Sequence, residues 1–126
     1  MSAKYRELDV VVVRTLHVPT RNVSGTVRVV RQPRVGDQAA IVHILDSAHC
    51  VVECVDSSGD TSWLADFHID ELVPSLNKWK FEVCEVSAGA YRAVGNGPRN
   101  IHVESTDTDP DKALADCRAF ALRYPE

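Results

Sequence analysis

Long apolar runs are missing from the sequence, and their absence argues against a membrane-spanning helix. Such a helix needs about 20 consecutive apolar residues, and no stretch of the 126 residues approaches that length. The opening residues, MSAKYRELDV, also lack the apolar segment of a secretory signal. We therefore expect a cytoplasmic protein with no membrane partner, in which the four cysteines are free thiols.

Paired metal ligands are missing as well. The spacing Cys-x2-Cys, which is typical of zinc sites, occurs nowhere in the chain. Histidine and cysteine are densest in HCVVEC, residues 49–54, but Cys50 and Cys54 lie four residues apart on a predicted strand, about 13 Å at roughly 3.3 Å per residue. That distance is too long for a shared zinc ion or a disulfide. We predict no metal site and no cofactor.

No group of residues typical of an enzyme is present. The glycines of SAGAY and VGNGP lack the strand-to-helix setting of a phosphate-binding loop, and Asp66, Asp70 and Glu71 lack the spacing of an EF-hand. Cys84 and His102 are both expected on the polar face of one sheet, but nothing is placed to orient the histidine, as nucleophilic catalysis requires. We predict that the protein is not an enzyme. A thiol enzyme built on Cys84 and His102 is a third hypothesis, well behind two hypotheses in which the protein acts by binding a partner.

Short β-branched runs separated by turn residues fill the first part of the chain. HIDELVP predicts one helical turn followed by a short strand that ends at Pro74. The arginine-rich segment 23–35 is β-branched, and Pro33 makes its end an edge or a turn. This pattern is typical of an SH3-like small β-barrel, with a sandwich of similar size as the alternative. The other predicted strands cover 8–14, 39–45, 49–55 and 61–66.

The register of the central hairpin decides which side chains enter the core. That face is apolar, so we expect both Cys50 and Cys54 to lie in the core beside Trp63, where cysteine behaves as a small apolar side chain. His43 and His49 are then diagonal neighbours on the outer face. With the three-residue loop Asp46-Ser47-Ala48, the pairs on the core face are Ile44–Cys50, Val42–Val52 and Ala40–Cys54.

The pattern changes after PSLN, residues 74–77, which predicts a linker. WKFEVCEV alternates apolar and polar residues, and GAYRAVG and RNIHVES predict two further strands. TDTDPDKALADCRAFALRY predicts a helix with Asp109 as its N-cap and Pro110 at its first position. Its apolar stripe includes Leu114 and Cys117.

The predicted fold class is therefore α+β, mostly β. An SH3-like small barrel is expected over residues 1–76, with an Arg-rich insertion at about 17–34. A three-stranded antiparallel meander with one C-terminal helix is expected over residues 77–126. We expect this second unit to pack on the barrel or on a partner, because about 50 residues bury too little apolar surface to be stable alone.

Charge is unevenly distributed, although the net charge is only −4. Five arginines and no acidic residue lie in 14–34, whereas eight acidic residues and no Lys or Arg lie in 35–77. Such blocks steer a charged partner; alternatively, basic and acidic strands lie side by side and neutralise each other. A pI near 5.7 and few aromatic residues argue against nucleic acid as the partner.

Several motifs of the predicted barrel occur together: LDVVV in the first strand, the Gly36-Asp37 turn, VVECVDSSGDT and the closing DELVP. On these motifs, about half of the chain resembles a family of small bacterial domains known as domain of unknown function 4926. The insertion of residues 17–34 departs from that family. The C-terminal residues FEVCEVSAGAYRAVGNG and VESTDTDPDKALADC separately resemble the β-β-β-α core of HicB-type antitoxins, although the usual last strand of that family is missing here.

Both resemblances imply an immunity or antitoxin protein, because members of the first family are similar to partners of toxin-like proteins. The leading hypothesis is that the chain covers the active site of a cognate bacterial toxin, with a nuclease as one candidate. An acidic block is suited to covering a basic cleft. The alternative is an RNA- or ribosome-associated adaptor that uses an arginine hairpin. The predicted contact residues are an acidic patch, Asp56, Asp60, Asp66, Asp70 and Glu71, and a projecting hairpin with Arg28, Arg31 and Arg34.

Overall fold

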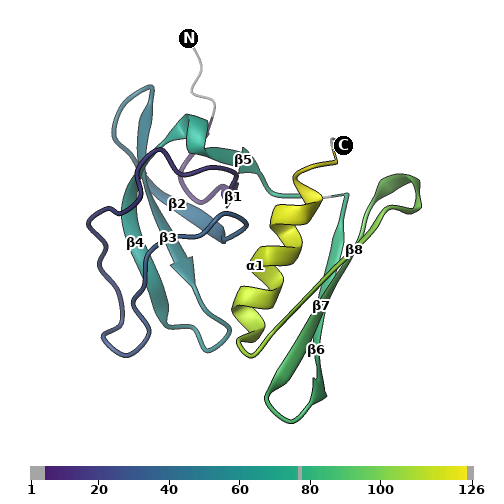
Figure 1. Ribbon diagram of the computed structural model, residues 1–126. Helices are drawn as coiled ribbons and strands as arrows, with labels where there is room; N and C mark the ends of the chain where they lie inside the picture. The colour runs from purple at the N-terminus through teal and green to yellow at the C-terminus, as the bar shows by residue number, and fades with distance from the viewer. Residues whose placement is uncertain (1–4, 77, 125–126) are drawn as a thin grey trace.

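The computed structural model describes residues 5–76 and 78–124. Its strands form two antiparallel sheets, one of five strands and one of three, and an α-helix lies between the sheets (Figure 1). The predicted fold class, α+β and mostly β with a C-terminal helix, is therefore confirmed. Within the described residues, no helix has the length and apolar character needed to cross a membrane.

The five-stranded sheet fits the predicted SH3-like small barrel. Its strands lie in the order β4-β3-β2-β1-β5. The predicted helical turn is the 3-10 turn η1, Ile69–Glu71, which joins β4 to β5. The strand bounds are Val10–Val13 (β1), Gln38–Ile44 (β2), His49–Val55 (β3), Thr61–His68 (β4) and Leu72–Pro74 (β5).

Alternation along β3 and β4 builds the core of this sheet. Cys50 and Cys54 are buried beside Trp63 and Phe67, and Cys54 pairs with Trp63 in the register, as predicted. The rings of Trp63 and Phe67 lie 5.1 Å apart. Burial raises the pKa of Cys50 to about 11 and that of Cys54 to about 12. Both thiols therefore stay protonated and act as small apolar side chains.

A β-bulge at Val42 corrects the predicted hairpin register. The loop gives the expected pair Ile44–Cys50, but the register shifts at Val42, so that Ile41 pairs with Val52. The expected pairs beyond that point are wrong: Ile41 is fully buried and Val42 is 37 % exposed. An extra residue in one strand reverses its alternation, and here it carries the larger side chain of Ile41 into the core.

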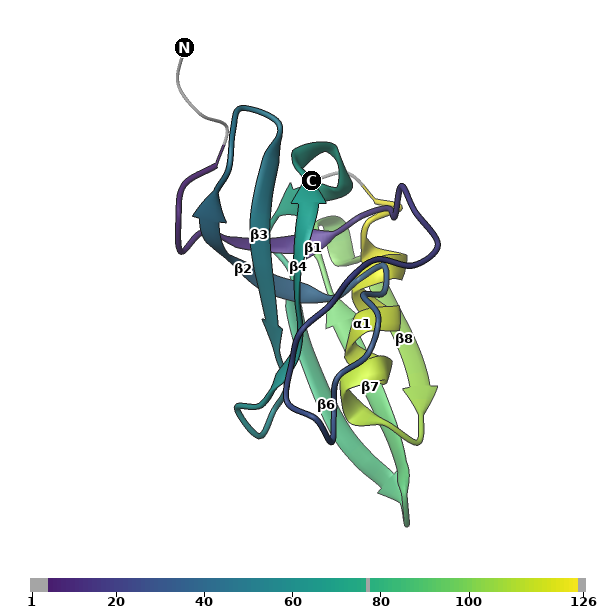
Figure 2. The same cartoon turned by 90° about the vertical axis from the view of Figure 1, so that its left-hand side faces the viewer.

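Residues 17–34, here called the strap, make up most of the connection between β1 and β2 and form no regular strand. The prediction of a strand within 23–35 is therefore wrong. The strap lies along β4, the edge strand of the sheet (Figure 2). Ser24 exchanges two backbone hydrogen bonds with β4, and Thr26 and Arg31 donate one each to the first residues of that strand. These bonds occupy backbone groups that an edge strand otherwise exposes.

The three-stranded sheet is a meander in the order β6-β7-β8, and the helix covers one of its faces. Asp109 is the helix N-cap, as predicted, and its carboxylate accepts hydrogen bonds from the N–H groups of Asp111 and Lys112. Cys117 is buried on the predicted stripe between two buried alanines, Ala113 and Ala121. The bounds are Lys80–Ser87 (β6), Ala90–Asn96 (β7), His102–Asp107 (β8) and Pro110–Ala121 (α1), and a 3-10 turn η2, Pro98–Asn100, precedes β8.

The helix also contacts the five-stranded sheet, through the turn before β2. Gly36 in this turn has a φ of +94°, and a Cβ at that position would lie 1.8 Å from the carbonyl oxygen of Ala115. Arg118 Nη1 donates to the carbonyl of Gly36 at 3.4 Å. The predicted boundary between residues 76 and 77 falls at Asn77, which lies outside the described residues, and stays a prediction.

Gly36→Ala should therefore separate α1 from the barrel. The left-handed φ alone costs an alanine about 1 kcal/mol, and the overlap with the Ala115 backbone adds to it, so we expect a total loss of about 3 kcal/mol. Gly59→Ala is the matched control, since Gly59 has a φ of +87° and open space around its Cβ position. Urea unfolding followed by tryptophan fluorescence measures both variants, and equal midpoints would contradict the helix contact.

Candidate functional site

The predicted acidic patch is divided between the two ends of β4. Asp56 and Asp60 lie in the turn before this strand, whereas Asp66 and Asp70 lie at its far end. Six residues of extended chain separate Asp60 from Asp66, about 20 Å at roughly 3.3 Å per residue. Asp56 also serves the turn itself, because it accepts hydrogen bonds from the N–H groups of Ser58 and Asp60. The structure therefore does not bring these carboxylates together as one patch.

Glu71 does not belong to a surface patch, because it is buried. It is 2 % exposed, forms an ion pair with Arg21, and accepts hydrogen bonds from the N–H groups of His17 and His68. Burial alone would raise the pKa of Glu71, but the guanidinium and the hydrogen bonds outweigh burial and hold the pKa below its ordinary value. Glu71 therefore fastens the strap to η1.

Of the three arginines of the predicted hairpin, only Arg28 is exposed. Arg31 donates two hydrogen bonds to the buried carboxylate of Asp37, at 2.8 and 3.0 Å, and the backbone N–H of Arg34 donates to the same group. Arg34 is only partly exposed, whereas Arg28 is exposed. The basic and acidic blocks thus neutralise each other in part, which was the alternative prediction. The RNA-adaptor hypothesis required three exposed arginines and retains one.

Cys84 and His102 lie apart on the meander. Cys84 pairs with Arg92 and His102 pairs with Asn96. These partners are four residues apart on β7, about 13 Å at roughly 3.3 Å per residue. The His102 ring instead bonds Asn96 and Glu104 at the surface. The thiol-enzyme hypothesis therefore lacks the geometry that it needs.

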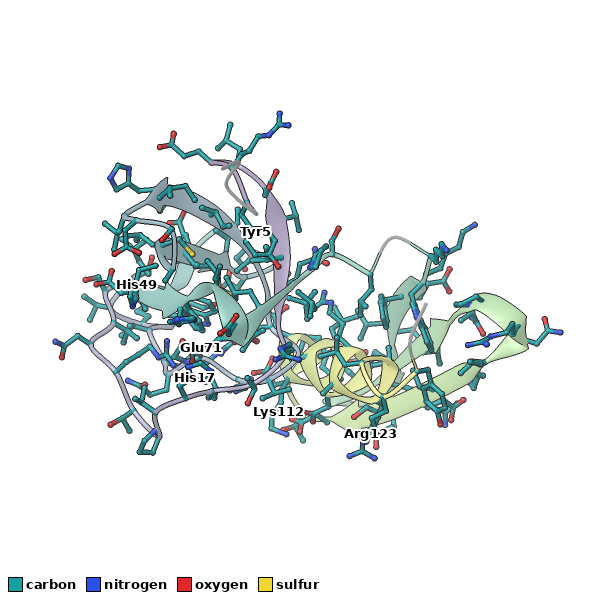
Figure 3. All side chains as sticks on the ribbon, turned by 90° about the horizontal axis from the view of Figure 1, so that it is seen from above. Tyr5, His17, His49, Glu71, Lys112 and Arg123 are labelled. Carbon is teal, nitrogen blue, oxygen red and sulfur yellow. The ribbon has the colours of Figure 1, made fainter. Side chains whose placement is uncertain are left out.

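Three histidines from different elements meet at the far end of β4. His17 lies in the strap, His49 begins β3 and His68 ends β4. The ring centroid of His68 lies 5.5 Å from that of His17 and 5.2 Å from that of His49. Figure 3 shows His17, His49 and Glu71 on the side of the barrel away from the C-terminal helix. The rings border a hollow of about 320 Å³, here called the histidine cleft, whose other lining residues are Val18, Arg21, Asp66, Phe67 and Glu71.

A second hollow continues the histidine cleft along the strap. Its volume is about 400 Å³, and it shares Arg21 and Asp66 with the cleft before it reaches Ser24 and Leu64. Together the two hollows form a groove between the strap and the outer faces of β3 and β4.

Arg21 forms the floor between the two hollows. Its guanidinium carbon lies 4.0 Å from the ring centroid of Phe67, and its Nη1 donates to the carbonyl of Asp66 at 3.0 Å. The ion pair with Glu71 neutralises its charge. An aromatic face, a carboxylate and a carbonyl thus surround this guanidinium.

Asp46 and Asp70 lie outside the lining of the cleft, each beside one of its histidines. Asp46 accepts a hydrogen bond from the His49 ring at 2.9 Å, and the N–H of Ala48 together with this ring lowers the pKa of Asp46. His68 Nδ1 accepts a hydrogen bond from the N–H of Asp70 at 3.0 Å, which requires that nitrogen to be unprotonated. Among the described residues, no group of three or more His, Cys, Asp or Glu side chains is arranged to hold a metal ion.

No sequence motif connects His17 or His68 with His49. One signal was present, because the predicted pairing of Cys54 with Trp63, continued for five residues along the hairpin, places His49 opposite His68. His17 offered no such signal, since its position depends on the path of the strap.

Comparisons of the chain with protein-family models, with curated proteins and with solved structures find no match. The resemblances to the domain of unknown function 4926 and to HicB-type antitoxins therefore stay predictions.

Glu71→Gln should destabilise the protein most at neutral pH. A carboxylate with a lowered pKa contributes stability that is present above its ordinary pKa of 4.5 and is lost as the pH falls through the lower folded value. At pH 7 we expect a loss of about 3 kcal/mol, because Arg21 keeps its charge without a partner. Urea unfolding measures the difference from wild type, which should shrink below about pH 4.5. With exposed Glu82→Gln as the control, an equal difference at both pH values would contradict the role of the pair.

Cys84 should be the one fast-reacting thiol of the four. It is exposed, whereas burial raises the pKa of Cys50 and Cys117 to about 11 and that of Cys54 to about 12. Native protein should react with one equivalent of a disulfide reagent quickly, and with the remainder only after denaturation. Cys84→Ser should remove the fast phase, and Cys117→Ser should retain it. A second fast thiol would show that a core opens readily.

Proposed function

We propose that the chain is an immunity- or antitoxin-type protein that acts in the cytoplasm by binding a cognate bacterial toxin and covering its active site. The observation that carries this proposal is the groove between the strap and β4, with its acidic rim. No catalytic arrangement accompanies the groove within the described residues. Such a surface favours binding over chemistry.

The groove has a fixed shape, which favours tight binding. The N–H of Arg21 donates to the side-chain oxygen of Gln32 at 2.9 Å, and the side-chain nitrogen of Gln32 donates back to the Arg21 carbonyl at 2.8 Å. The N–H of His17 donates to Glu71 at 2.8 Å. These hydrogen bonds hold the strap in place before a partner binds. A preorganised surface loses little conformational entropy on binding.

The exposed carboxylates fit a basic partner. Asp66 lines the groove, and Asp70 and Asp46 lie beside His68 and His49 at the same end of the barrel. A nuclease binds phosphate through basic groups in its active site. An acidic surface attracts such a basic site and speeds the encounter of the two proteins. A nuclease toxin is therefore the class of partner that this surface suits best.

Co-expression with the product of the neighbouring gene tests this proposal. We expect the two proteins to purify together, and we expect the chain to restore growth to cells that the neighbouring product inhibits. Charge reversal by Asp66→Lys with Asp70→Lys should weaken the complex by about tenfold or more, because two attractive contacts become repulsive.

Glu82→Lys is the matched control, because Glu82 is exposed on the meander, away from the groove. It should leave the complex intact. A neighbouring product that neither inhibits growth nor binds the chain would refute the proposed function. Equal binding by the double variant and the control would instead place the contact outside the groove.

A further inference from the structure

We infer that the histidine cleft receives a basic side chain of the partner, an arginine in an extended segment. The inference rests on the proposed function in one respect, namely that the occupant belongs to a protein. The cleft offers three imidazole rings from His17, His49 and His68 and, where it joins the second hollow, the carboxylate of Asp66.

The cleft already accommodates one guanidinium, that of Arg21. This group lies over the Phe67 ring and donates to the Glu71 carboxylate and to the Asp66 carbonyl. Because Arg21 and Glu71 neutralise each other, they add no net charge to the space above them. The residues that line the cleft therefore already bind one arginine side chain. The part of the cleft that Arg21 does not fill has hydrogen-bond acceptors of its own.

The remaining carboxylates decide the sign of the ligand. Asp66 lines the cleft and forms no ion pair with a Lys or Arg side chain within the described part of the chain. Asp46 and Asp70 lie outside the lining, beside His49 and His68. An anion in the cleft would meet Asp66, whereas a cation would find an acceptor there, and a planar cation would also use the rings.

The imidazoles favour arginine over lysine. The ring of His17 is inclined at 45° to that of His68, and the ring of His49 stands edge-on to it at 80°. A planar guanidinium stacks on such rings while its N–H groups reach carboxylates at the side, whereas an ammonium offers only a point charge. The Nδ1 atom of His68 is occupied by the N–H of Asp70, so the ring presents its face and Nε2 to a ligand.

The length of the groove fits an extended segment. Its lining runs along β4 from Leu64 to His68, a span of about 13 Å, or about four residues of extended chain. The second hollow, lined by Val23, Val51 and Leu64, then receives apolar neighbours of the arginine. The pair of hollows thus specifies a basic residue followed or preceded by apolar ones.

A nuclear magnetic resonance titration of the whole chain with short capped peptides tests the site. The probe is Val-Arg-Val, and the matched peptide is Val-citrulline-Val, which has the same shape without the charge. We expect Val-Arg-Val at about 10 mM to shift the amide signals of residues 17–24, 49–51 and 64–68. The citrulline peptide should give less than about a tenth of the effect, because the charged hydrogen bonds are lost.

Variants assign the interaction to the cleft. Asp66→Asn should weaken Val-Arg-Val binding by about fivefold or more, whereas Asp60→Asn at the opposite end of β4 should not.

Shifts of equal size with both peptides, or shifts elsewhere on the chain, would overturn the inference. So would unchanged binding in Asp66→Asn. These outcomes are independent of the co-expression test. Arginine binding in the cleft without a toxic neighbour removes the proposed function and keeps the site, and a toxin complex that is insensitive to Asp66→Asn removes the site and keeps the function.

Discussion

The buried carboxylate of Asp37 is the interaction on which most of this structure depends. It is 2 % exposed and accepts two hydrogen bonds from Arg31, one from the Arg34 N–H and one from Trp63 Nε1 at 2.9 Å. One group thus joins the strap, the start of β2 and the main aromatic residue of the core. An unpaired carboxylate there would be strongly destabilising, so the strap and the core must assemble together. Gly36, the preceding residue, carries the contact with α1.

The ion pair between Arg21 and Glu71 repeats this arrangement at the other end of the strap. Arg31 and Arg21 are anchored on opposite sides of the strap's turn, and both use carboxylates from the acidic half of the barrel. The separation of charge along the sequence is therefore largely a folding device: a segment without regular hydrogen bonding is held down by two partly buried pairs. The pairs also fix the position of His17, because Glu71 binds its backbone N–H as well.

Local patterns predicted the elements, and long-range contacts decided the site. Alternation and turn residues were sufficient for β3, η1 and the Asp109 cap, because each depends on neighbours within a few residues. The bulge at Val42 was not predictable in this way, since it serves the packing of Ile41 against the whole core. The strap was misjudged for a related reason. Its β-branched residues favour a strand, but two ion pairs with distant carboxylates set its path, and the approach of His17 to His68 follows from that path.

The same pairing explains which charges remain for a partner. Folding pairs Arg21 with Glu71 and Arg31 with Asp37. It leaves Asp66 and Asp70 exposed. The two blocks hold five arginines and eight acidic residues, so the two buried pairs leave three arginines and six acidic residues, and the excess charge is negative. The groove lies between the rigid strap and β4. The shape of the histidine cleft therefore follows from the folding interactions themselves, since any change that loosens the strap also displaces His17.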